Sequence, residues 1–238
     1  MSASPDPTTV LVVTAHPDDV DFGAAGSIAT WTDQGIRVTY CIVTDGAAGS
    51  AIPGIEAAAL RQIRQDEQRK AAAEVGVTDV HFLGYPDGSL VVSLELRRDI
   101  ARMIRIVRPD RVVCQSPERN WERIRASHPD HLAAGEATLQ AVYPDARNPY
   151  AHPELLEAGL APHVVEEVWL MAAPRFTRGV DITATIERKL SALRSHQSQL
   201  AETANLDEMI RSWATANAVA LQMPEGRLAE AFQVVDTR

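Results

Sequence analysis

The sequence has little of what several large protein classes require. Only two of its 238 residues are cysteines, Cys41 and Cys114, and each lies in an apolar run. This excludes a disulfide scaffold and predicts two buried free thiols. No apolar run approaches the roughly 20 residues that a membrane-spanning helix needs. The N-terminus also lacks a basic segment followed by an apolar one. We therefore expect a cytoplasmic protein that does not enter a membrane.

Basic residues are too few and too dispersed for a nucleic-acid-binding protein. Lysine and arginine total 23 against 32 acidic residues, which gives a formal net charge of −9. A grip on a phosphate backbone needs a basic patch, so nucleic acid is excluded as a partner. The composition is otherwise that of a globular protein, with 45% hydrophobic and 23% charged residues. The length suits one domain over residues 1–238, with residues 1–8 flexible.

Apolar runs alternate with helical segments over most of the chain, which predicts an α/β fold with a mostly parallel, Rossmann-like sheet flanked by helices. The predicted strands are residues 10–15, 37–44, 80–83, 111–115 and 164–171. The predicted helices are residues 23–34, 55–75, 94–107, 130–142 and 181–200. A variable C-terminal segment, residues 201–238, is predicted to be helical with an interruption at 224–226.

A first cluster of polar residues, His16-Pro17-Asp18-Asp19, follows the first predicted strand. The imidazole of His16 and the carboxylate of Asp19 are suitable Zn²⁺ ligands and can point at one centre. Asp18 would then lie beside the metal without binding it, ready to accept a proton from water. The alternative is an acidic, helix-capping turn in which Asp18, Asp19 and Asp21 favour the helix dipole.

A second cluster, His128-Pro129-Asp130-His131, follows another buried strand. His131 can complete a set of two histidines and one carboxylate that leaves a coordination position open, as in catalytic zinc sites. His128 could stabilise an oxyanion and protonate the leaving amine, with Asp130 holding its tautomer. Alone, this cluster could equally be a surface histidine pair at a helix start. Together, the two clusters favour a catalytic metal site.

The two clusters resemble the hallmarks of the LmbE-like, or PIG-L, family of zinc-dependent de-N-acetylases. These hallmarks are Ala-His-Pro-Asp-Asp, here residues 15–19, and His-Pro-Asp-His, here residues 128–131. The resemblance implies one zinc ion per chain held by His16, Asp19 and His131, although another divalent ion could replace it. It also implies that Asp18 is the general base and that His128, oriented by Asp130, is the acid or oxyanion stabiliser.

Shorter motifs agree with this resemblance, namely Thr44-Asp45-Gly46, the Arg64–Glu67 pair, Val75-Gly76-Val77, Asp87-Gly88 and His196-Gln197-Ser198-Gln199. The resemblance makes Arg64, Asp87 and His196 candidates for contacts with an acetamido sugar. Arg64 could otherwise lie on a solvated helix face, and His196 could otherwise be a capping or packing residue. One feature departs from the family: some members have a tyrosine shortly before the second motif, where this chain has Arg125-Ala126-Ser127.

The resulting hypothesis is hydrolysis of an acetamide on an N-acetylglucosamine unit that is attached to a small carrier. The alternatives are a zinc amidase for thiol-cofactor conjugates and a metal-binding or ligand-binding protein without turnover. A nucleotide-binding domain is disfavoured, because the turn after the first strand is not glycine-rich and its two carboxylates would repel phosphate. The sequence leaves open whether the protein forms a homo-oligomer.

Overall fold

Residues 7–49, 54–201 and 203–238 are described by a computed structural model, and they contain one seven-stranded sheet with the strand order β3-β2-β1-β4-β5-β7-β6. The strands are β1 (Thr9–Thr14), β2 (Arg37–Thr44), β3 (Asp79–Tyr85), β4 (Arg111–Gln115), β5 (Glu167–Met171), β6 (Arg178–Asp181) and β7 (Ala229–Asp236). The first five strands pair in parallel, whereas β7 pairs antiparallel with both β5 and β6. The predicted mostly parallel α/β sheet is therefore confirmed. Most of the residues predicted to be flexible, 1–8, lie outside the described ranges.

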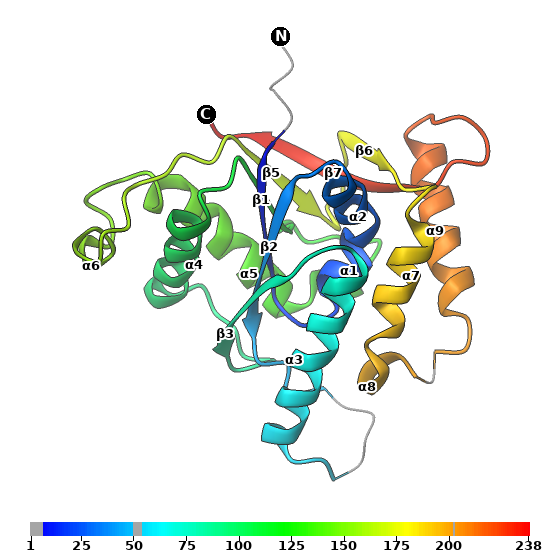
Figure 1. The fold of residues 1–238 in the computed structure, drawn as a ribbon, viewed down its shortest axis with the longest axis horizontal. Coiled ribbons are helices and arrows are strands. Elements are labelled where there is room, and N and C mark those ends of the chain that lie inside the picture. Colours follow the sequence, from blue (N-terminus) through cyan, green and yellow to red (C-terminus); the bar gives the residue numbers. More distant parts are fainter. Residues whose placement is uncertain (1–6, 50–53, 202) are drawn as a thin grey trace.

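Helices cover both faces of the sheet (Figure 1). They are α1 (Asp19–Gly23), α2 (Ala25–Asp33), α3 (Ala57–Glu74), α4 (Leu94–Val107), α5 (Pro129–Gln140), α6 (Pro153–Glu157), α7 (Ile186–Arg194), α8 (Gln197–Leu200) and α9 (Leu206–Ala220). A 3₁₀ turn, η1 (Ile124–Ser127), precedes α5, and a π-helical segment, η2 (Ala141–Asp145), follows it. None of the helices in the described ranges is long and apolar enough to cross a membrane.

The central strand β1 is fully buried and divides the core into two layers. Leu11 and Val13 face a cluster built with α4 and α5, whereas Val10 and Val12 face a cluster built with α1, α2 and α3. Successive side chains of a strand point to opposite faces, which explains why a strand covered on both sides is a continuous apolar run. Cys41 and Cys114 are free thiols in this core, as predicted.

The order of the strands places two loops next to each other at the centre of the sheet. From β1 the chain moves outward through β2 to β3, and then crosses back to β4 on the other side of β1. The carboxyl ends of β1 and β4 therefore lie side by side at the point where the direction of winding changes. In open α/β sheets this is where ligand sites form. The His16 motif follows β1, and the His128 motif follows β4.

The C-terminal part differs from the sequence-based prediction. Residues 206–220 are helical, but the predicted helix beyond them is wrong, because Ala229–Asp236 form strand β7 inside the sheet. Phe232 packs against both Trp31 and Trp169 there, so tertiary packing outweighs the helical propensity of the local sequence. Strand β6 was not predicted. The predicted helix 23–34 is interrupted at Ala24, and the predicted helix 181–200 begins at Ile186 and is broken near His196.

Candidate metal centre and active site

Three side chains from the two motifs direct ligand atoms at one point. His16 Nδ1 lies 3.2 Å from His131 Nε2 and 3.2 Å from Asp19 Oδ2, and His131 Nε2 lies 3.0 Å from Asp19 Oδ1. Ligand atoms about 2.0–2.1 Å from a tetrahedral zinc ion are about 3.3–3.4 Å apart. The spacing of these atoms therefore fits a single small cation bound between them.

The local backbone explains why these three residues converge. The N–H of Ala15 donates to Gln115 Oε1 (2.9 Å), which ties the end of β1 to the end of β4. Asp19 begins α1 and its Oδ2 accepts the backbone N–H of His16 (2.6 Å). His131 lies in the first turn of α5, and its Nδ1 donates to the carbonyl of Ala126 (3.3 Å), which leaves Nε2 free to bind a metal.

The second nitrogen of His16 is held by two carboxylates. His16 Nε2 lies 3.1 Å from both Asp87 Oδ1 and Asp130 Oδ2. Asp130 is completely buried and accepts the backbone N–H groups of Gly88 (2.7 Å) and Leu90 (3.1 Å). A carboxylate on the far nitrogen fixes the tautomer of a metal-binding histidine, and here these contacts leave His16 Nδ1 available to a metal. His16, Asp87 and Asp130 themselves bring ligand-type atoms within 4.8 Å of one another.

The position of Asp130 corrects one sequence-based expectation. Its carboxylate contacts His16 rather than His128, because the first turn of α5 directs Asp130 into the core. The bond between Asp130 and His128 runs through the backbone instead: the N–H of Asp130 donates to His128 Nδ1 (3.2 Å). Asp130 is therefore in place to orient His16.

His128 lies at the exposed edge of the cluster, with its ring centroid 5.1 Å from that of His16 and 5.4 Å from that of His131. Its Nδ1 accepts a hydrogen bond, so in the neutral ring the proton is on Nε2. Burial and the nearby His16 and His131 lower the pKa of His128. This arrangement makes His128 a neutral hydrogen-bond donor beside the centre.

Asp18 lies next to the three converging residues, and its carboxylate is paired with Arg64. Arg64 Nη2 donates to Asp18 Oδ2 (3.2 Å). Burial and the charge of Asp19 raise the pKa of Asp18 to about 6, against the opposing effects of Arg64 and nearby histidines. The structure therefore has one carboxylate at the centre and a second one next to it.

The charges of the cluster favour a bound cation. Burial alone would lower the pKa of His16, but the carboxylates of Asp19 and Asp87 outweigh it and raise this pKa to about 11. The pKa of His131 is raised as well, because Asp19 outweighs the effect of burial. In turn, His131 and His16 overcome burial and hold the pKa of Asp19 well below its usual range. Positive charge is thus strongly stabilised at the point where the ligand atoms meet.

Two residues predicted to contact substrate do not reach the surface. Arg64 is buried and donates to the carbonyls of Gly46 (3.0 Å) and Pro17 (2.8 Å), so it does not lie on a solvated helix face. His196 is completely buried, and its Nε2 lies 2.8 Å from Asp21 Oδ2. The burial of His196 matches the packing role that the sequence leaves open, whereas its contact with a substrate stays a prediction. Arg64 contacts the first motif directly, and His196 is linked to it through Asp21 and Gln68. Asp87 also faces inward, with Oδ2 accepting the N–H of Ala48 (3.0 Å).

Comparison with known proteins agrees with this geometry. The family model described as PIG-L, GlcNAc-PI de-N-acetylase, matches residues 11–142, more than half of the chain. A diacetylchitobiose deacetylase of Thermococcus kodakarensis is 34% identical over 197 residues, which cover 83% of this chain and 72% of that protein. The chain belongs to the PIG-L family.

Two further PIG-L-like proteins extend the comparison. A probable N-acetyl-α-D-glucosaminyl L-malate deacetylase 2 of Bacillus anthracis is 32% identical over 205 residues, which cover 81% of each chain. The solved structure of the N,N'-diacetylchitobiose deacetylase from Pyrococcus horikoshii, in complex with its inhibitor MPG, superposes with a TM-score of 0.89. It is 29% identical in sequence, and the match covers 98% of this chain and 85% of that one. The fold of this chain is therefore shared with that deacetylase.

Some residues around the centre were missed by sequence reasoning. Gln68 contacts the backbone of Asp18 and the carboxylate of Asp21, and Gln115 anchors Ala15. Their signal in the sequence is weak, because glutamine on a helix or at a strand end is common and carries no motif. The residues that stand where some PIG-L members have a tyrosine, 125–127, lie in η1 and contribute the carbonyl of Ala126 to His131.

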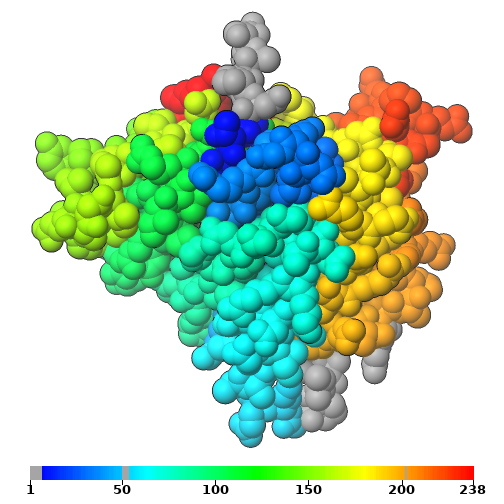
Figure 2. Space-filling view, in the orientation of Figure 1, coloured from blue at the N-terminus to red at the C-terminus, as the bar shows by residue number. Residues whose placement is uncertain are grey.

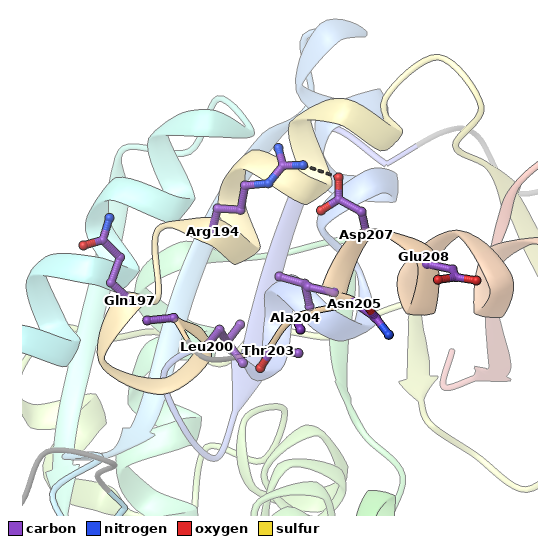
Figure 3. Close-up of a pocket in the computed structure, with 10 residues that line it drawn as sticks. Arg194, Gln197, Leu200, Thr203, Ala204, Asn205, Asp207 and Glu208 are labelled. Atoms are coloured by element: carbon purple, nitrogen blue, oxygen red, sulfur yellow. Dashed lines mark hydrogen bonds and ion pairs between the residues drawn. The ribbon is translucent and has the colours of Figure 1, made fainter.

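The hollow in Figure 3 lies apart from this centre. It has a volume of about 590 Å³ and is formed by α8, the end of α7 and the start of α9. An ion pair between Arg194 and Asp207 closes one side. It is lined by none of the residues of the two motifs.

Proposed function

We propose that this protein is a zinc-dependent hydrolase that removes the N-acetyl group from a small molecule containing N-acetylglucosamine. The observation that carries the proposal is the convergence of His16 Nδ1, Asp19 and His131 Nε2 within 3.2 Å of one another. A further carboxylate, Asp18, which is paired with Arg64, and an exposed imidazole, His128, lie next to them. Membership of the PIG-L family and the names of the relatives support the same reaction.

The donor atoms fit a divalent metal. The ring nitrogens of His16 and His131 face each other at 3.2 Å, and at most one of them can carry a hydrogen in that gap. A cation between them, completed by Asp19, satisfies both lone pairs. Two imidazoles and one carboxylate favour Zn²⁺ among the common divalent ions, and they leave a position open for substrate or water. When bound, zinc would polarise the acetamide carbonyl and make water more acidic.

Asp18 is proposed as the general base. Its carboxylate would accept a proton from the water that attacks the acetamide carbon, and Arg64 would hold it in place. The C–N bond then breaks, and acetate and a free amine are released after the amine takes up a proton. His128 is proposed as the acid or oxyanion stabiliser, as the sequence suggests. Its Nε2–H would donate to the oxyanion and would be able to pass a proton to the amine.

The substrate is proposed to be an acetamido sugar joined to a small carrier, and the site of action the cytoplasm, as the sequence predicts. The relatives are named for chitobiose and glucosaminyl-malate substrates, which share the acetamide and differ in what is attached to it. An amidase for thiol conjugates would use the same residues, but no observation favours it. A protein that only binds metal has no need for a carboxylate held beside the centre by Arg64.

The test is acetate release by the zinc-loaded protein from three probes, with a chelated sample as control. The probes are diacetylchitobiose, N-acetylglucosaminyl malate and an N-acetylglucosaminyl inositol. We expect release from at least one probe, its loss on chelation and its return with added zinc. No release from any probe, by protein shown to hold one zinc ion per chain, would reject the proposed function.

A further inference from the structure

The backbone of Asp18 is in a conformation that an aspartate does not readily adopt. Its φ is 90° and its ψ is −29°, a left-handed conformation. Residues with a side chain are disfavoured there, and such a conformation persists only where surrounding contacts hold it. Asp18 also precedes α1, and its carbonyl accepts the N–H groups of Asp21 (2.9 Å) and Phe22 (3.1 Å). These bonds stabilise the start of the helix. They do not involve the peptide group between Pro17 and Asp18, which other residues hold.

That peptide group, between Pro17 and Asp18, is held at both ends by one helix. Arg64 Nη2 donates to the carbonyl of Pro17 (2.8 Å), and Gln68 Oε1 accepts the N–H of Asp18 (2.8 Å). Arg64 and Gln68 are four residues apart on α3, so they lie on the same face, one turn from each other. Both side chains belong to buried residues.

The orientation of the Gln68 amide is fixed by Asp21. Its Nε2 donates to Asp21 Oδ2 (2.9 Å), and the same oxygen lies 2.8 Å from His196 Nε2. A carboxylate accepts but does not donate, so the amide nitrogen must face Asp21 and the amide oxygen must face Asp18. Asp21, Gln68 and His196 are all completely buried, which prevents water from replacing these bonds.

We propose that Gln68, Asp21 and His196 are positioning residues that hold Asp18 in its left-handed conformation and so place its carboxylate beside the metal centre. None of the three touches the ligand atoms or the carboxylate of Asp18 in the contacts of the described residues. The inference rests on the proposed function only in that Asp18 is the general base.

Gln68 is the best residue to test because it contacts the backbone of Asp18 and not its carboxylate. A change to methionine keeps the length and removes both hydrogen bonds without adding charge. Ser198 provides a matched control on the same contact between α3 and α8, whose surfaces meet in Figure 2. Its N–H and Oγ donate to Glu67 (2.8 and 2.6 Å), the neighbour of Gln68, but this contact does not lead to Asp18.

The experiment compares Gln68→Met, His196→Leu, His196→Gln and Ser198→Ala in the full zinc-loaded chain, with the one of the three probes that the wild type deacetylates fastest. We expect Gln68→Met to lower kcat by about 10–100-fold, because misplacing a catalytic group by a small distance has effects of that order. KM and zinc content should stay unchanged. His196→Gln keeps an N–H for Asp21 and should retain more activity than His196→Leu, whereas Ser198→Ala should keep kcat within about twofold.

Crystal structures of the wild-type protein and Gln68→Met provide a readout that does not depend on turnover. We expect φ of Asp18 to leave the left-handed region in the variant. A Gln68→Met protein with wild-type kcat, or one in which φ stays near 90°, would overturn the inference. So would an equal loss of kcat in Ser198→Ala. If the wild type releases no acetate from any of the three probes, the proposed function fails while the crystal structures still decide this point. If Gln68→Met does not fold, the two His196 variants decide it by the same readouts.

Discussion

The two His-Pro-Asp motifs have the same first three residues, but the structure uses the first and third of them in opposite ways. In the first motif, His16 is buried and faces the metal centre, while Asp18 lies beside the centre next to Arg64. In the second motif, His128 is exposed at the edge, and Asp130 is completely buried against His16. Identical residue types at identical spacing therefore have different environments and different chemistry.

The point at which each helix begins explains this difference. In the first motif the residue preceding the helix is Asp18, the third of the four, and its backbone is left-handed. In the second motif it is His128, the first of the four, so Asp130 already lies inside the first turn of α5. Only the fourth residues, Asp19 and His131, are used alike: they face each other at 3.0 Å. The helix thus starts two residues earlier in the second motif than in the first. As a result, the first motif turns its histidine inward, whereas the second motif turns its aspartate inward.

The largest expected effect comes from a change at Asp18, the third residue of the first motif, that removes its ability to act as a base. Asp18→Asn should lower kcat by about 10²–10⁴-fold, because an amide cannot accept the proton from the attacking water. Zinc content, measured by atomic emission, should remain at one ion per chain because Asp18 is not among the three converging residues. Turnover at the wild-type rate would show that Asp18 is not the base. The proposed difference in role between Asp18 and Asp130 would then be wrong.

The first residues of the two motifs, His16 and His128, can be compared directly by changing each to alanine. His128→Ala should keep its zinc and lose about 10²–10³-fold in kcat, the usual effect of losing one oxyanion donor. His16→Ala should lose zinc, since it removes one of the three converging atoms. Metal content after dialysis and acetate release are the measurements. Zinc loss in His128→Ala would place that histidine among the ligands, a possibility its grouping with His16 and His131 makes worth testing.

The third residue of the second motif should act on metal affinity. Asp130→Asn weakens the carboxylate contact with His16 Nε2, and the loss of such a contact typically costs 10–100-fold in affinity, about 1–3 kcal/mol. We expect a competition titration with a chelating dye to show this decrease, and added zinc to restore most of kcat. An Asp130→Asn protein with normal zinc affinity but reduced kcat would instead support the sequence-based view that Asp130 serves His128.

The sequence could suggest the three converging residues because the motifs join ligand types to the ends of buried strands. His16, Asp19 and His131 could be named, and the apolar runs of β1, β2 and β4 located the loops that carry them. The partners of these residues could not be named in the same way. Asp130 could be paired with His128 or with His16, and the choice depends on where α5 begins, which single residues do not determine.

The sequence also could not predict which polar side chains are buried. Arg64 and His196 are types that usually reach solvent or a ligand, yet both are enclosed by packing between α3, α7 and the start of α1. Strand β7 shows the same limitation. Its Glu230 is buried because Lys189 Nζ (2.6 Å) and the N–H of Ser27 (2.7 Å) bind it, and the second of these contacts spans most of the chain. Long-range partners of this kind leave no local signal.

The smallest expected effect concerns the bond that joins the two motifs through the sheet. The N–H of Ala15 donates to the buried Gln115 Oε1, which ties the first motif to β4, the strand before the second motif. Gln115→Met would leave this N–H buried without an acceptor and should lower the free energy of unfolding by about 1–3 kcal/mol, as measured by urea denaturation. The matched control is Gln140→Met, which removes a side-chain bond to Glu136 on the outer part of α5 and should change stability by no more than about 0.5 kcal/mol. Equal stability of the two variants would show that the motifs are positioned independently, each by its own helix start.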